Sequence, residues 1–70
     1  MSKVQSIIFD KKQWTSQSAH RWLHAHHTKP IKAAHETKHF LRYRLRNPEM
    51  FSRFITKKLP NGIDLIIGFY

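Results

Sequence analysis

The chain has 70 residues and carries 13 Lys or Arg against four Asp or Glu, so its formal net charge at pH 7 is +9. This length supports one small domain, residues 1–70, and the lack of cysteine excludes a disulfide framework and a thiolate metal site. No apolar run approaches the roughly 20 residues of a membrane span, and the start lacks the long apolar core of a signal peptide, so we expect a soluble, intracellular protein.

The first half of the chain predicts a strand followed by a helix. Residues 3–9 are rich in β-formers and indicate the strand. Thr15 is the predicted N-cap of a helix over about residues 16–27, and Pro30 lies beyond its end. One face of this helix is apolar at the spacing i, i+3, i+4 and i+7, through Ala19, Trp22, Leu23 and His26.

The second half predicts several strands. Residues 31–34 are a weak strand candidate, and residues 38–46 are a strong one because apolar and polar residues alternate. Asn47-Pro48 marks a turn, followed by one predicted helical turn.

A hairpin is predicted at the end of the chain. Residues 53–58 and 63–69 flank Asn61-Gly62, which is a strong short-range hairpin signal. The resulting order is β-α-β-β-β-β, or a close variant. It predicts an α+β fold in which one helix packs on one face of a small antiparallel sheet.

The last predicted strand is apolar on both faces. Ile63, Leu65, Ile67 and Phe69 share one face, whereas Ile66 and Tyr70 lie on the other. A strand of this kind needs cover on both sides. The sequence offers one helix, so we expect a homodimer in which a second copy supplies the cover. The alternative is local burial under the loop of residues 47–54.

The run FLRYRLR, residues 40–46, places arginine at every second position. Alternate side chains of a strand share a face and lie about 6.6–6.8 Å apart, which is close to the roughly 6.8 Å advance of two phosphate steps along DNA. An ordinary solvated face would carry mixed charges, and no acid interrupts this run. We therefore predict that Arg42, Arg44 and Arg46 contact a phosphate backbone.

Other basic residues are predicted to extend this contact. The residues predicted to widen the patch lie on a later strand and are Arg53, Lys57 and Lys58. The residues predicted to make secondary contacts are Lys11, Lys12 and Arg21.

The positive charge indicates a polyanionic partner, because so large a surplus raises self-repulsion when it is not neutralised. The partner could be DNA, RNA, an anionic membrane or an acidic protein. A membrane is disfavoured, since the predicted helix is rich in histidine and has one arginine. Hydrophobic residues make up 40% of the chain, which indicates a folded domain.

Histidines and aromatic residues supply two weaker functional patterns. His20, His24 and His27 share one helical face and could hold a metal, but such residues are more often ordinary polar surface, and we predict no metal site. As surface residues they would strengthen polyanion binding below roughly pH 6.5. Phe40 and Tyr43 lie near the arginines, but base stacking is the weaker interpretation. We expect Phe9, Trp22, Phe54 and Phe69 to be core residues.

Signatures of catalysis are missing from the sequence. The two glycines, Gly62 and Gly68, form no phosphate-binding loop. No paired carboxylates have a spacing suited to acid–base work, and no nucleophile lies in a recognisable elbow. We therefore predict neither an enzyme, nor a cofactor, nor a small-molecule substrate.

The run IIFDKKQWTSQSAHRWLHAH, residues 7–26, resembles a short module, F-D-K-x-x-W-T-x-x-x-A-x-x-W-L, of phage proteins and of large DNA viruses. The following HFLRYRLR and RFITKKLPNGIDLIIGF are similar to the module's strand and closing hairpin. The chain also resembles a small basic protein of Marseillevirus-like giant viruses. This resemblance implies a viral origin, a role on a DNA genome, and a place in the virion or in the host cytoplasm or nucleus.

These patterns together predict a non-enzymatic nucleic-acid-binding homodimer that contacts the phosphate backbone without strong sequence specificity, with DNA favoured over RNA. The alternative is a virion or assembly module whose basic face binds an acidic protein.

Overall fold

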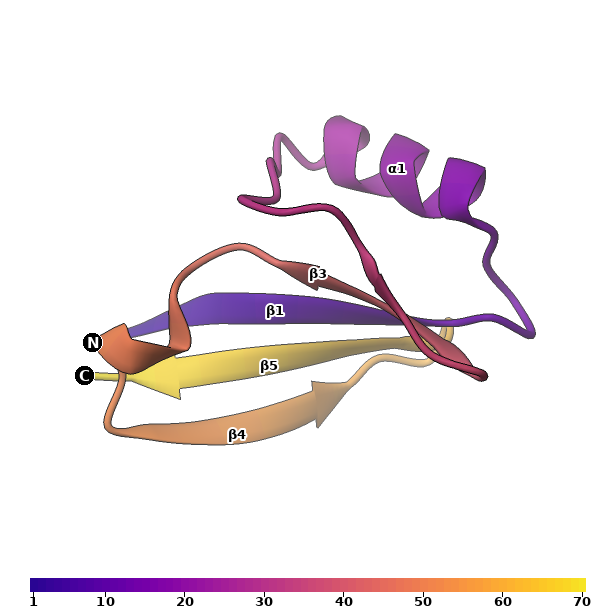
Figure 1. Ribbon diagram of the computed structural model, residues 1–70. Helices are drawn as coiled ribbons and strands as arrows, with labels where there is room; N and C mark the ends of the chain where they lie inside the picture. The colour runs from indigo at the N-terminus through magenta and orange to yellow at the C-terminus, as the bar shows by residue number, and fades with distance from the viewer.

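The computed structural model describes all residues, 1–70, and contains one antiparallel sheet with a helix on one face (Figure 1). The strand order is β2-β3-β1-β5-β4. This architecture confirms the predicted α+β fold and its β-α-β-β-β-β order. In chain order the elements are β1 (Ser2–Asp10), α1 (Ser16–Ala25), β2 (His35–Glu36), β3 (Phe40–Arg44), the 3-10 helix η1 (Pro48–Met50), β4 (Arg53–Lys58) and β5 (Ile63–Phe69).

Local hydrogen bonds set both ends of α1. Thr15 is the N-cap, as predicted, because its hydroxyl accepts a hydrogen bond from the Ser18 backbone N–H at 3.1 Å. At the other end His27 adopts a positive φ of 53°, and the Thr28 N–H donates to the Leu23 carbonyl at 2.8 Å. This C-terminal motif ends the helix at Ala25, two residues earlier than predicted.

The second and third predicted strands begin and end at other residues than expected. β2 is formed by residues 35–36 instead of 31–34, and β3 is limited to Phe40–Arg44. Residues 38 and 39 lie in a tight turn, since the Thr37 hydroxyl accepts a hydrogen bond from the Phe40 N–H. Ile31 makes one backbone hydrogen bond, to the Arg44 carbonyl, so residues 31–34 run beside β3 without forming a strand.

The core lies between α1 and the three strands β3, β1 and β5. The register places Ile7 opposite Tyr43 and Phe9 opposite both Leu41 and Ile63, so these side chains share one face. They pack with two buried helix residues, Ala19 and Leu23. Phe9 also makes edge-to-face contacts with Trp14, Trp22 and Tyr43, at centroid distances of 5.1, 5.7 and 5.5 Å.

The opposite face of the sheet is only partly covered. The connection from β3 to β4 passes across the end of the sheet near the two chain termini (Figure 1). Phe51 from this connection packs so closely on Gly68 that a Cβ added there would lie 2.3 Å from the ring. The loop of residues 47–54 therefore covers this end of β5, which is the predicted alternative to cover by a second copy of the chain.

The prediction that Phe54 belongs to the core was wrong. Phe54 lies on β4 opposite Gly68, and 44% of its surface is exposed. β4 is the edge of the sheet, so no further strand shields it, and α1 covers the other face. The hairpin between β4 and β5 is as predicted, with Gly62 at a φ of 78° in its turn. The one helix, α1, is too short and too polar to span a membrane.

Candidate nucleic-acid interface

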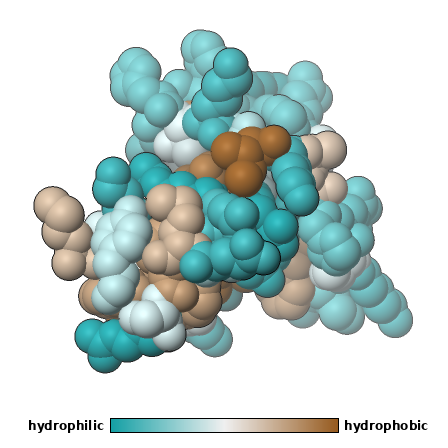
Figure 2. Space-filling view, turned by 60° about the vertical axis from the view of Figure 1, so that its left-hand side comes forward, coloured by the Kyte–Doolittle hydropathy of each residue, from teal (hydrophilic) through white to brown (hydrophobic).

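The cationic side chains are almost entirely uncompensated. Lys11 and Glu36 form the single ion pair of the structure, so every other Lys and Arg lacks a carboxylate partner. The surface is therefore strongly positive, with few negative groups to weaken its field. At the end of the molecule that bears both termini, hydrophobic residues lie among the hydrophilic ones (Figure 2).

Arg42 and Arg44 lie on the face of the sheet that α1 leaves open. Their pairing partners on β1 are Ile8 and Ser6, which alternate with the core residues of that strand. Arg42 is exposed and Arg44 is half-buried. Alternation along β3 thus positions two guanidinium groups on one face, as the sequence predicted for this pair.

Two basic residues outside β3 join this pair. His35 of β2 lies directly opposite Arg42 in the sheet, and Lys32 comes from the segment beside β3. With Arg42 and Arg44 they line a hollow of about 460 Å³ that contains no acidic side chain. Nothing in the sequence pattern points to Lys32 and His35, because only the position of residues 31–36 beside β3 brings them to the arginines. We call these four residues the β3 basic surface.

Arg46 does not continue the row of arginines, so the prediction of three evenly spaced side chains was wrong. β3 ends at Arg44, and the guanidinium of Arg46 donates a hydrogen bond to the Val4 carbonyl at 2.7 Å. Its backbone is held by Gln5, whose side-chain amide donates to the Arg46 carbonyl at 2.8 Å. The sheet is irregular here, since the pairing of β1 with β5 shifts between Val4 and Ser6. This bulge redirects Arg46.

The cations of β4 do not widen the β3 basic surface, contrary to expectation. β1 and β5 separate β4 from β3, which puts the two strands about 14 Å apart at the usual spacing. Arg53 and Lys57 also lie on the face that α1 occupies, since they pair with Phe69 and Leu65. Lys58 lies on the open face. Arg53, Lys57 and Lys58 therefore form a separate basic edge.

The three predicted secondary contacts lie in different surroundings. Lys11 is paired with Glu36, so its charge is neutralised in the free protein. Lys12 is exposed in the turn after β1, and its backbone N–H donates to the Asp10 carboxylate at 2.9 Å. Arg21 is exposed on α1. None of them lines the hollow of the β3 basic surface.

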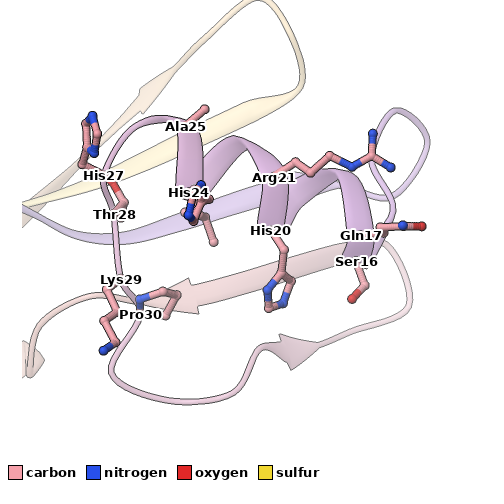
Figure 3. Close-up of a pocket in the computed structure, with 11 residues that line it drawn as sticks. Ser16, Gln17, His20, Arg21, His24, Ala25, His27, Thr28, Lys29 and Pro30 are labelled. Carbon is pink, nitrogen blue, oxygen red and sulfur yellow. The ribbon is translucent and has the colours of Figure 1, made fainter.

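The histidines of α1 border a different hollow. His20 and His24 project from α1, while His27 lies beyond its end, with Arg21 and Lys29 nearby (Figure 3). No three His, Asp or Glu side chains come close enough together to hold a metal ion. The His20 ring packs edge-on against Tyr43 at a centroid distance of 5.4 Å. This histidine face is thus partly engaged in packing.

The environment of Tyr43 changes the ionisation of its hydroxyl. It is 1% exposed, and its hydroxyl has no hydrogen-bond partner. Burial raises the pKa of Tyr43 above its usual value; the negative charge of Glu36 adds to the shift, and the Ser16 hydroxyl nearby opposes it. Since its ring is buried, Tyr43 cannot stack on a base.

The comparisons with known proteins add no relative. No protein-family model matches the chain, and no curated protein or solved structure is significantly similar to it. The candidate interface therefore rests on its own geometry and charge.

Proposed function

We propose that this protein is a non-enzymatic nucleic-acid-binding protein whose β3 basic surface contacts the phosphate backbone. The observation that carries the proposal is the uncompensated charge: a net +9 with a single ion pair. Keeping cations unpaired in a chain of this size raises self-repulsion, which a bound polyanion would relieve.

The geometry of β3 supports phosphate as the group recognised. Arg42 and Arg44 are two residues apart on one strand face, so their spacing of about 6.7 Å suits two phosphates of one backbone. Guanidinium groups bind phosphate oxygens in bidentate fashion. Contacts of this kind position a nucleic acid without reading its bases, so weak sequence specificity is part of the proposal.

The proposal includes DNA as the nucleic acid and a homodimer as the binding unit. Ile66 of β5 is half-buried on the open face, and Phe54 on the neighbouring strand β4 is 44% exposed. A second copy seated on these residues would bury apolar surface and leave the arginines of both copies free. A role on a viral genome follows from the resemblance to the viral module and is proposed on that basis alone.

A second candidate is an acidic protein partner, favoured by the basic edge. All six residues of β4 are exposed, and three of them are cations. An unpaired strand edge can add an extended peptide through backbone hydrogen bonds, and acidic residues would suit this edge.

The test is a salt series of fluorescence anisotropy titrations with a labelled DNA duplex. Each phosphate contact contributes about −0.9 to the slope of log K against log salt, so the Arg42→Gln/Arg44→Gln variant should bind more weakly with a slope smaller by about 2. Arg53→Gln/Lys57→Gln, which removes the same charge from the other edge, is the matched control.

Two results would reject the proposal. One is a slope near zero for the unaltered protein, since backbone binding must release counterions. The other is an equal loss of affinity in both double variants, because net charge alone would then account for binding. Binding of an acidic peptide that the β4 variant abolishes would favour the second candidate.

A further inference from the structure

A third concave site lies between the C-terminal end of α1 and the sheet, away from the β3 basic surface. It is a cleft of about 650 Å³, within the usual size range of small-ligand sites. Its apolar lining comes from β1, from β5 and from the residue that follows β3. These residues are Val4, Ile7, Leu45 and Leu65.

Two flat rings form part of the lining. Trp22 and His26 stack with a centroid distance of 3.8 Å and an interplanar angle of 20°. The pair is held in place, because a His26 ring nitrogen lies 2.8 Å from the Trp22 carbonyl oxygen and Phe9 packs edge-on against the indole. His26 covers one face of the indole, so the platform for another flat aromatic ring is the exposed His26 ring together with the indole surface that remains in the cleft.

Three cations border the same cleft. Lys3 comes from β1, Lys29 from the segment after α1, and Arg46 from the segment after β3. The hydrogen bond to the Val4 carbonyl fixes Arg46 at this position, and no acidic side chain lines the cleft. An apolar interior bordered by cations and by no acidic residue fits a ligand that has a flat apolar part and an anionic part.

We propose that this cleft binds one unpaired nucleotide, with its base beside Trp22 and its phosphate at Lys3, Lys29 and Arg46. The inference rests on the proposed function and makes it more specific. Bases of an intact duplex are stacked on one another and cannot enter, so the preferred ligand is single-stranded nucleic acid or a duplex with a single-stranded end. Stacking on an aromatic side chain tolerates any base, which agrees with weak sequence specificity.

The two tryptophans make the cleft directly observable. Trp14→Phe leaves Trp22 as the reporter, whereas Trp22→Phe leaves Trp14, whose indole N–H donates to the Asn61 carbonyl at the far hairpin. Each variant is titrated with an oligothymidylate and with an abasic oligomer of equal length. We expect the oligothymidylate to quench Trp22 and leave Trp14 unchanged. The abasic oligomer should bind at least about 5-fold more weakly, without quenching.

A charge variant provides a second measurement that leaves the core intact. Lys3→Gln/Lys29→Gln alters two exposed residues of the cleft border. It should weaken single-strand binding more than duplex binding, whereas Arg42→Gln/Arg44→Gln should weaken both. Circular dichroism of every variant verifies that the fold is retained.

Failure of this inference and failure of the proposed function give different results. If the oligothymidylate binds by anisotropy without quenching Trp22, or quenches both tryptophans equally, the cleft assignment is wrong and phosphate binding stands. If neither oligomer nor duplex binds, both proposals are wrong. If decanoate quenches Trp22 and the oligothymidylate does not, the cleft accepts an anionic amphiphile and the nucleotide assignment is rejected.

Discussion

The two faces of the sheet are built from alternate residues of the same strands, yet their environments differ. On β3, Leu41 and Tyr43 face α1 and are buried, while Arg42 and Arg44 point to the open face. On β1, Phe9 is in the core, and Ile8 beside it is half-buried on the open face. A period of two residues thus separates the part of each strand that stabilises the fold from the part available for binding.

This separation has a consequence for mutational effects. Substitutions on the covered face should change the free energy of unfolding, and those on the open face should change binding. The contrast does not hold at one end of the open face. There Phe51, from the connection between β3 and β4, packs against Gly68 and Phe54.

The largest expected effect is at Phe9. Phe9→Ala removes a fully buried ring that contacts three other aromatic residues, so it should lower the free energy of unfolding by about 3–5 kcal/mol. Urea denaturation followed by circular dichroism measures this change. Phe54→Ala on the open face is the control and should cost far less. Equal losses would contradict the contrast between the two faces.

An intermediate effect is expected at Gly68. Gly68→Ala would place a Cβ 2.3 Å from the Phe51 ring, and displacing that ring should cost about 1–3 kcal/mol. The double variant with Phe51→Leu should recover part of the loss, because the smaller side chain relieves the clash. Strict additivity of the two substitutions in urea denaturation would show that Phe51 does not seat on Gly68.

A pH-dependent effect is expected at Tyr43. Burial raises its pKa in the folded state, so the unfolded chain loses this proton first, and stability should fall as the pH rises above about 10. Tyr43→Phe should leave stability at pH 7 almost unchanged, because the buried hydroxyl has no partner to lose. Urea denaturation at pH 8 and pH 11 should show a smaller alkaline loss in the variant. The same alkaline loss in both proteins would show that ionisation of Tyr43 does not cause the loss of stability.

The smallest effect on stability is expected on the β3 basic surface. Arg42→Gln and Arg44→Gln should each change the free energy of unfolding by no more than about 0.5 kcal/mol, since neither side chain has an ion-pair partner. Thermal or urea denaturation of the variants checks this. A large loss of stability would mean that the arginines serve the fold.

Several features were predictable because they depend on neighbours in the sequence. Thr15 caps the helix through a residue three positions away, and Asn61-Gly62 turns the chain between adjacent strands. The alternation within residues 40–44 was enough to assign Arg42 and Arg44 to one face and Leu41 to the other. Arg46 follows the same alternation in the sequence, but a bulge in β1 turns it away from the face that carries Arg42 and Arg44.

By itself, the sequence determined the order of elements, the two sides of each strand and the excess of positive charge. These follow from local hydrogen bonding, residue period and composition. Only the tertiary structure decided which cations lie together. Pairing between distant segments put β4 at the far edge from β3, brought Lys32 and His35 to the arginines, and enclosed the cleft beside Trp22. Such pairings depend on the burial of the whole core, which no short stretch of sequence encodes.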